Sequence, residues 1–153
     1  MSEINKNSKV FLKEITKETA RSIMKLEVHD YQKNYVASNS VSIAQAYFDE
    51  HAWFRAIYAD DTPVGFLMLY IDTEKPDFYL WRFMIDKQYQ KLGFGSKALQ
   101  LVIEYVKTFA NAEKIELSYV PGEHSAVKIY KRLGFVDTGR MEEDELVMEL
   151  KLK

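Results

Sequence analysis

The stretch YQKLGFGSKA, residues 89–98, lies where a strand-like run of sequence gives way to a helical one. Gly93 and Gly95 within it are two of only six glycines in the chain. Glycine destabilises regular structure, so it is expected where the backbone needs an unusual conformation or where a ligand approaches closely. A strand, a glycine turn and a helix together expose free backbone N–H groups at the positive end of the helix. This arrangement predicts a binding site for a phosphate or pyrophosphate group.

The glycine turn does not match either common nucleotide-binding motif. It lacks the GK[ST] ending of a P-loop, and Gly93-Phe94-Gly95 has no third glycine at the spacing of the dinucleotide fingerprint. Taken alone, a tight connection between a strand and a helix is the simpler explanation of the two glycines. A second motif is therefore needed to assign a function.

The hydrophobic pattern on both sides of the turn predicts a mixed α/β sheet covered by helices. Residues 78–86 are almost continuously apolar or aromatic, as expected for a central strand covered on both faces. Residues 96–109 follow as an amphipathic helix. Other strands are expected at 10–15, at 53–71 as a hairpin around ADDTP, at 114–120, and in a hairpin that ends the chain; other helices are expected at 16–28 with Thr16 as its cap, from Asn39 or Ser40 to about Glu50, and at 124–133.

Composition indicates one globular domain, residues 1–153. The chain is 47% hydrophobic and 29% charged, which is ordinary for a domain with a real core. No apolar run reaches the roughly 18–20 residues of a membrane span, and MSEINKNSKV lacks the apolar core of a signal peptide, so we expect a cytoplasmic protein without membrane contacts. A net charge of −2 argues against broad capture of nucleic acid.

The supply of reactive side chains excludes several kinds of chemistry. The chain has no cysteine, which excludes disulfides, thiol nucleophiles and thiolate metal sites. Its three histidines, His29, His51 and His124, are far apart in sequence and form no HxxxH or HxH pair, so we expect no metal. Any reaction must use other groups.

A second motif follows about 35 residues after the glycine turn. SAVKIYKRLGF, residues 125–135, places Tyr130 on the inner face of a short helix that ends at Gly134. The two segments together resemble the GCN5-related N-acetyltransferase (GNAT) family. The phosphate-binding signature of that family reads here as Gln90-Lys91-Leu92-Gly93-Phe94-Gly95, and its second signature reads as Ala126, Tyr130 and Leu133-Gly134-Phe135. Within the family, YVASNS and LWRFMIDKQYQ are most similar to bacterial diamine and polyamine acetyltransferases of the spermine/spermidine type.

The resemblance implies a fold and a cosubstrate. The fold is a mixed, mostly antiparallel sheet with splayed central strands, flanked by about four helices. The cosubstrate is acetyl-CoA, whose pantetheine arm inserts between the splayed strands. The residues that the resemblance assigns to this molecule are Phe83, Met84 and Ile85 for the arm and thioester, Gln90, Lys91, Leu92, Gly93, Phe94, Gly95 and Ser96 for the pyrophosphate, and Glu123, Ala126 and Tyr130 at the second signature. Lys97 could add charge, although a solvated surface lysine explains it equally.

Tyr130 is the predicted general acid. A tyrosine, with an ordinary pKa near 10, can protonate a thiolate whose thiol has a pKa near 8.5. With no cysteine in the chain, direct attack by the amine in a ternary complex is simpler than a covalent acyl-enzyme. Polyamine acetyltransferases of eukaryotes carry a Glu nine residues before the Gln90 position, where this chain has Trp81. The candidate base is then Glu116, acting through water, and the alternative is a chain of solvent molecules.

The acceptor is predicted to be a small primary amine, with polyamines as the leading class. A pocket for a polycation should contain carboxylates and aromatic rings. In the resembled fold the first two helices form the acceptor wall, where Glu27, Asp30 and Tyr31 are candidates with Tyr35 close behind, and Trp81 is a further one. A homodimer is possible by analogy with the family.

Two alternatives remain open from the sequence. One is acetylation of a protein N-terminus or a lysine, which would use the same donor site with a different acceptor groove. The other is a CoA-binding module that regulates a partner without catalysis, which the absence of a carboxylate at Trp81 suggests.

Overall fold

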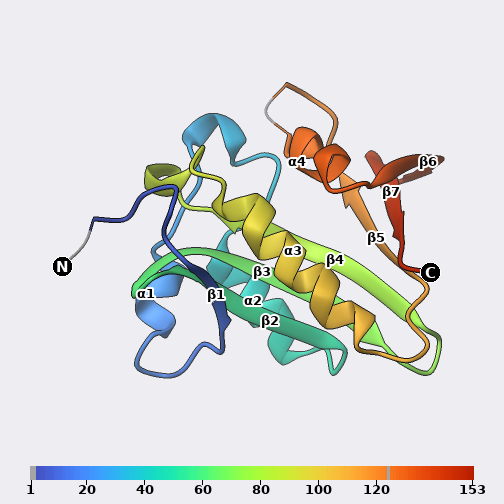
Figure 1. The fold of residues 1–153 in the computed structure, drawn as a ribbon, viewed down its shortest axis with the longest axis horizontal. Coiled ribbons are helices and arrows are strands. Elements are labelled where there is room, and N and C mark those ends of the chain that lie inside the picture. The colour runs from blue at the N-terminus through green and yellow to red at the C-terminus, as the bar shows by residue number, and fades with distance from the viewer. Residues whose placement is uncertain (1–2, 124) are drawn as a thin grey trace.

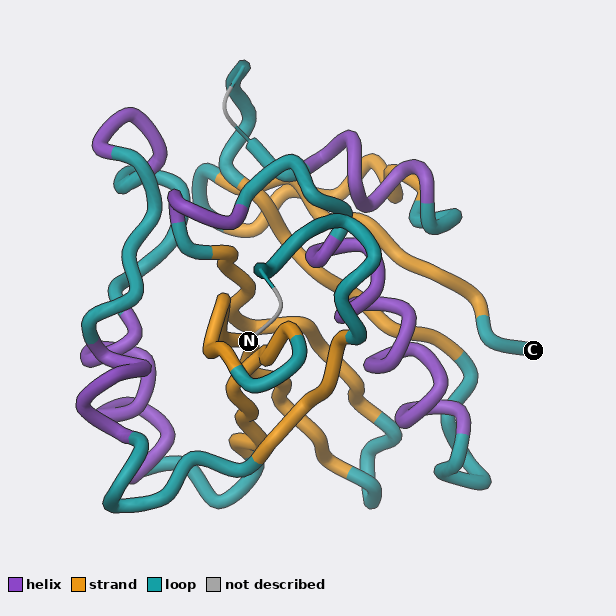
Figure 2. The backbone as a smooth tube through the Cα atoms, turned by 60° about the vertical axis from the view of Figure 1, so that its left-hand side comes forward, coloured by secondary structure: helices purple, strands orange, loops and turns teal. Residues whose placement is uncertain are grey.

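The computed structural model describes residues 3–123 and 125–153 as a single sheet with helices on both faces (Figures 1 and 2). The sheet has seven strands in the order β1-β2-β3-β4-β5-β7-β6. The strands are β1 (Val10–Lys13), β2 (Ala52–Ala59), β3 (Thr62–Asp72), β4 (Asp77–Ile85), β5 (Lys114–Tyr119), β6 (Val136–Glu142) and β7 (Glu145–Lys151). The helices are α1 (Ala20–Met24), α2 (Asn39–Tyr47), α3 (Phe94–Lys107) and α4 (Val127–Arg132), with the short 3-10 turns η1 (Asp30–Gln32) and η2 (Lys87–Tyr89).

The predicted element order and fold class are confirmed. Every neighbouring strand pair is antiparallel except β4 and β5, which run parallel. The predicted hairpin around ADDTP is the β2–β3 turn, and the predicted central strand is β4, in the middle of the sheet. Within the described residues, no helix has the length and apolar character needed to cross a membrane.

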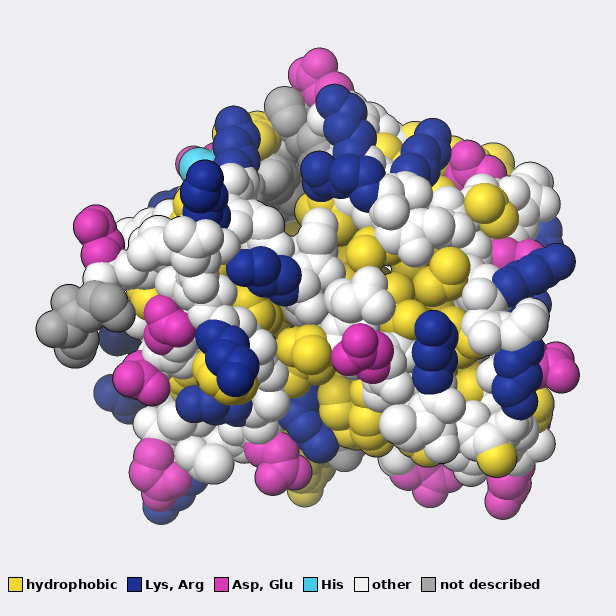
Figure 3. All heavy atoms as spheres, in the orientation of Figure 1, with side chains coloured by type: hydrophobic (Ala, Val, Ile, Leu, Met, Phe, Trp, Pro, Cys, Tyr) yellow, Lys and Arg dark blue, Asp and Glu magenta, His cyan; other side chains and the backbone are white. Residues whose placement is uncertain are grey.

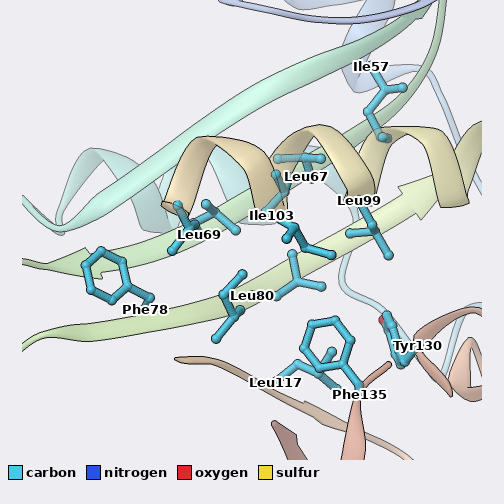
Figure 4. Close-up of a cluster of buried hydrophobic side chains, with 14 of the residues drawn as sticks. Ile57, Leu67, Leu69, Phe78, Leu80, Leu99, Ile103, Leu117, Tyr130 and Phe135 are labelled. Carbon is cyan, nitrogen blue, oxygen red and sulfur yellow. The ribbon is translucent and has the colours of Figure 1, made fainter. Parts of the chain in front are cut away.

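Two hydrophobic cores lie on opposite faces of the sheet because successive strand residues point to opposite sides. On β3, Leu67 and Leu69 join the larger core beneath α3, which Figure 4 shows together with Tyr130 and Phe135. Phe66 and Met68 join the smaller core, which also contains Ile23 of α1. Nearly continuous hydrophobicity in the central strands therefore reflects burial from both sides.

The central strands separate after a very short pairing. β4 and β5 are paired only at Tyr79 with Glu116 and Leu80 with Leu117. Immediately afterwards the register between β3 and β4 shifts, so that Trp81 is an extra residue on β4. A bulge of this kind bends its strand and increases the local twist. β4 therefore continues to Ile85 along β3 alone, while β5 continues along β7.

The first helices differ from their predicted bounds. The helix expected over 16–28 is only Ala20–Met24, because the backbone at Glu27 bonds to another part of the chain: its N–H donates to the Asp86 carboxylate at 2.8 Å, and its C=O accepts from Lys87 N–H at 2.8 Å. Thr16 does not cap this helix, whose N-cap is Thr19. Residue 124, where the helix over 124–133 was expected to begin, lies outside the described residues.

The predicted cap of the second helix was also wrong. Ser38 is the N-cap, and its hydroxyl accepts from the Val41 N–H at 3.2 Å. Asn39 is instead buried, and its amide donates to the Ile23 carbonyl at 2.9 Å. This side chain therefore joins α2 to α1, a long-range contact that local cap preferences do not reveal.

Gly65 provides a test of how tightly β3 and β4 pack. A Cβ at this position would lie 2.4 Å from the Met84 carbonyl oxygen, which is backbone and cannot move alone. We expect Gly65→Ala to destabilise the fold by about 1–3 kcal/mol through overpacking. Urea unfolding with an unchanged m-value would measure this loss, and Lys151→Ala, at an exposed strand end, should stay within about 0.5 kcal/mol of wild type.

Candidate functional site

A cleft of about 570 Å³ lies where β4 and β5 separate. Its walls come from β4, the start of α3, α4, the segment 32–37, and the ends of β5 and β7. Lys and Arg side chains gather along the upper part of the face that Figure 3 shows, with apolar side chains visible between them. Five lining residues are basic, whereas Glu145 is the single acid among those the structure describes there: the basic residues are Lys33, Arg82, Lys91, Lys128 and Arg132.

The glycine turn at one end of the cleft is held by a glutamine. The Gln90 amide donates to the Ile85 carbonyl at 2.9 Å and exchanges hydrogen bonds with the Gln32 amide at 2.9 and 3.2 Å. Lys91 and Gly93 both have positive φ, at 67° and 86°, and Gly93 is the N-cap from which α3 begins. The signature glutamine therefore fixes the end of β4 to the turn.

The two glycines of the turn have different roles. A Cβ on Gly93 would meet no described atom within 4 Å, so its left-handed backbone and the open space beside it explain its selection. A Cβ on Gly95 would lie 3.0 Å from the Phe83 ring, so Gly95 lets α3 pack closely on β4. Because Gly93 offers no capping side chain, the first N–H groups of α3 have no partner from the cap residue. These groups line the cleft and can bind an anion.

The second motif forms a Schellman C-cap that fixes Tyr130. Phe135 N–H donates to the Tyr130 carbonyl and Gly134 N–H to the Lys131 carbonyl, both at 3.1 Å. Gly134 has the required positive φ of 104°, and the Phe135 ring packs edge-on against Tyr130. The signature glycine and phenylalanine thus hold the tyrosine, which is only 7% exposed and lines the cleft. Burial raises the pKa of the Tyr130 phenol, with a smaller contribution from Tyr79, so the phenol is protonated at neutral pH.

A chain of three polar side chains lies at the fork between β4 and β5. Tyr79 donates a short hydrogen bond to the Ser118 hydroxyl, which donates to the Glu145 carboxylate at 3.0 Å. Ser118 and Glu145 line the cleft. Arg82 lies nearby and is half-buried. Burial lowers the pKa of its guanidinium, and the negative charge of Glu145 raises that pKa by a smaller amount. None of these residues was identified from the sequence, although strand alternation places Glu116 and Ser118 on one face of β5.

Most residues predicted to bind the cosubstrate come together in this cleft. The residues predicted for the cosubstrate that line it are Phe83, Met84, Ile85, Gln90, Lys91, Gly93, Phe94, Gly95, Ser96, Ala126 and Tyr130, and Trp81, which was predicted for the acceptor, lines it as well. Leu92 instead packs against the larger core, and Glu123 is exposed on the loop before α4. Lys97 points away and donates to the Lys6 carbonyl at 2.9 Å.

Four other predicted site residues do not line the cleft: Glu27, Asp30, Tyr31 and Glu116. Glu116 is bonded to Arg140 and lies 3.8 Å from Lys114. Glu27 lines a separate pocket of about 360 Å³ and pairs with Lys87 at 2.8 Å and Lys33 at 3.5 Å, contacts that lower its pKa. Asp30 pairs with Lys33 at 3.0 Å, which lowers the pKa of Asp30.

Tyr31 is half-exposed and stacks on His29 with ring centroids 5.0 Å apart. The ring of Tyr35 lines the cleft and lies against Gly122, where a Cβ would come within 2.2 Å of its hydroxyl. Among the described residues, no cluster of three or more His, Cys, Asp or Glu side chains could hold a metal ion.

The glycine turn, the gap between two central strands and a buried phenol lining the same cleft form the arrangement that the sequence led us to expect for an acyltransferase. Residues 20–135 match the acetyltransferase (GNAT) family. The chain belongs to this family and is an N-acetyltransferase.

Two relatives are similar along almost their whole length. The probable spermine N(1)-acetyltransferase of Bacillus subtilis subsp. natto (strain BEST195) is 28% identical over 148 residues, which are 91% of this chain and 97% of the relative. The spermine/spermidine N(1)-acetyltransferase of Bacillus subtilis (strain 168) has the same identity and coverage. The spermidine N-acetyltransferase of Vibrio cholerae in complex with CoA and spermine has the same fold, with a TM-score of 0.74 and 19% identity over 93% of this chain and 95% of that one.

Gly134 tests how the C-cap controls Tyr130. Alanine at its φ of 104° is strained, and we expect Gly134→Ala to cost about 1–2 kcal/mol and to lower turnover by shifting Tyr130. Gly139→Ala is the matched control, because Gly139 also has a positive φ, of 82°, but lies in β6. Thermal unfolding and steady-state kinetics would measure both effects. Equal turnover in the two variants would contradict the role of the cap.

Proposed function

We propose that this enzyme transfers an acetyl group from acetyl-CoA to a primary amine of a polyamine such as spermine or spermidine. The observation that carries the proposal is one continuous cleft that joins the glycine turn to Tyr130 through the gap between β4 and β5. The polyamine class follows from the two Bacillus subtilis relatives, which the chain matches over 97% of their length. We also infer that residues 1–153 form one catalytic domain.

The cleft fits the donor in three respects. The N–H groups at the start of α3 and the Lys91 side chain suit a pyrophosphate, with Lys128 and Arg132 on the opposite wall. The Ser125 hydroxyl is buried without a hydrogen-bond partner among the described residues, as expected for a group that a ligand completes. The side of β4 at 83–85 that faces the gap has no pairing with β5. Its backbone groups would bond to the amides of the pantetheine arm.

The proposed reaction needs a proton donor for the departing sulfur and an attacking amine. The bound thioester supplies an activated acetyl group. Tyr130 holds a proton in the cleft at neutral pH, because burial raises the pKa of its phenol, and it would give this proton to the departing sulfur. With no cysteine in the chain, we propose direct attack of the amine nitrogen in a ternary complex. Glu123 and Ala126 stay predicted contacts to the donor at the start of α4.

The acceptor side of the proposal is supported by Trp81, which lines the cleft as an aromatic surface for a cation. Glu27 and Asp30 would contribute only by exchanging their lysine partners for ammonium groups of the substrate. Tyr31 stays a predicted contact. The homodimer also stays a prediction. The structurally similar spermidine N-acetyltransferase of Vibrio cholerae has a dodecameric structure, so similarity of fold does not fix the number of subunits.

Release of free CoA thiol would test the activity directly. With acetyl-CoA present, we expect turnover on spermine and spermidine, and little on amino acids or on a peptide with a free N-terminus. Mass spectrometry of the product would show one added acetyl group. Turnover confined to the peptide would replace the polyamine with a protein acceptor.

Tyr130→Phe tests the proton donor. We expect kcat to fall by roughly 100-fold or more, the usual contribution of a general acid, with acetyl-CoA binding unchanged in calorimetry. Because the pKa of Tyr130 is raised, the wild-type rate should show no alkaline loss from this group below about pH 10. Tyr105→Phe, whose ring stacks on Trp53 away from the cleft, is the control. Full activity in Tyr130→Phe would remove the acid role.

A further inference from the structure

We infer that Glu145 is the base that removes a proton from the attacking amine, and that Ser118 and Tyr79 position its carboxylate. This inference rests on the proposed function, because it names the group that prepares the acceptor in the same cleft. It replaces the earlier candidate, Glu116, by a residue on a different strand.

The position of the three side chains follows from strand register. Leu80 and Leu117 are the last paired residues of β4 and β5, so Ser118 is the first residue of β5 beyond the fork. Ser118 lies opposite Val147 of β7, and Glu145 begins that strand. The Ser118 hydroxyl therefore donates a hydrogen bond to the Glu145 carboxylate at 3.0 Å and accepts one from the Tyr79 hydroxyl. The carboxylate is held at the point where the cleft passes between the strands.

This end of the cleft is also where the proton donor acts. Tyr130, Ser118 and Glu145 all line the same cleft. Tyr130 belongs to α4 and to the larger core. Leu117 and Tyr119 also contribute to that core, so Ser118, which lies between them on β5, faces the opposite side of the sheet. An acid and a base are thus available from opposite sides of the fork.

The carboxylate is available for a substrate. Among the described residues that line the cleft, Glu145 alone is acidic. Its Oε1 accepts from Ser118, and no hydrogen bond or ion pair between described residues uses its Oε2. Glu116 differs, because Arg140 and Lys114 already bind both of its oxygens. A cationic amine entering the cleft would therefore meet Oε2 of Glu145.

The charged and titratable groups around Glu145 come from three strands. Tyr79 and Arg82 belong to β4, Glu116 to β5, and Glu142 lies opposite Glu145 in the β6–β7 hairpin. Arg82 is the nearby cation, and no hydrogen bond or ion pair joins it to Glu145 among the described residues: its terminal nitrogens donate to Gln45 of α2 at 3.0 Å and to the Trp81 carbonyl at 3.1 Å, and its buried Nε has no partner there. Arg82 therefore leaves Oε2 to the acceptor.

The ammonium of the acceptor transfers one proton to Oε2 of Glu145 and becomes a neutral amine. Its nitrogen lone pair forms the new C–N bond to the acetyl carbon, and the electrons of the breaking C–S bond pass to sulfur, which takes the Tyr130 proton. The acetylated nitrogen then transfers its second proton to the Tyr130 phenolate, which restores the phenol. Glu145 then releases its proton to water, so the net products are the acetamide, free CoA thiol and one proton.

Glu145→Gln tests this role while preserving size. We expect kcat to fall by about 100-fold or more, with acetyl-CoA affinity unchanged, and the decline of kcat at acid pH to disappear because no carboxylate remains to be protonated. Ser118→Ala should lower kcat less, and Ser118→Thr should restore most of it. Glu149→Gln, on the same strand and paired with Lys114 at 3.6 Å, is the matched control and should retain wild-type kinetics.

The opposite results would overturn the inference. It fails if Glu145→Gln keeps the acid decline of kcat, or if Glu116→Gln abolishes that decline instead. An effect on KM alone would make Glu145 a charge that binds the acceptor, and the role as base would be rejected. Circular dichroism would show whether each variant retains its fold.

Failure of the inference and failure of the proposed function can be distinguished. If the wild type acetylates another amine but no polyamine, the proposed acceptor is wrong, and the same loss is still expected in Glu145→Gln on that other amine. If the wild type acetylates no amine, spermidine can be titrated into the complex with CoA while the carboxyl ¹³C shift of Glu145 is followed by NMR. An unchanged shift would overturn the inference by itself.

Discussion

The short pairing of β4 with β5 is the constraint on which the whole site depends. Parallel strands normally continue their ladder, because backbone groups left unpaired inside a protein are costly. Here the ladder ends after two residue pairs, at the bulge around Trp81, and the strands follow different partners. The larger core beneath α3 is continuous across both strands, so the fold tolerates the gap. Beyond the fork, the backbone groups on this side of β4 are not paired with β5.

Two small backbone motifs place chemical groups on either side of this gap. The Gln90 side chain and the left-handed Gly93 direct the first amides of α3 toward one end of the cleft. The Schellman cap at Gly134 holds α4 so that Tyr130 is buried at the other. In both cases the glycine supplies a backbone conformation, and the groups available for chemistry belong to its neighbours. A loss of either glycine would therefore act on function through geometry.

Much of this could be predicted from the sequence, because it depends on local patterns. Hydrophobic periodicity gave the order of the elements, and residues 90–96 and 126–135 are contiguous motifs whose positions in the cleft follow from the turns they form. The bounds of α1 and the cap of α2 were wrong for a shared reason. Glu27 and Asn39 bond to Asp86 and Ile23, residues distant in sequence that no local propensity identifies.

The acidic residue of the cleft could not be found in this way, because it depends on the register between β5 and β7. Alternation shows that Glu116 and Ser118 share a face of β5, but only the pairing of Ser118 with Val147 brings Glu145 to the fork. The same register places Glu116 opposite Glu149, with Lys114 close to both carboxylates and Arg140 bonded to Glu116. A shift of one residue would exchange the faces of the whole strand. The charge available to a substrate is thus set by how the last hairpin aligns on β5, not by the residue types that the chain contains.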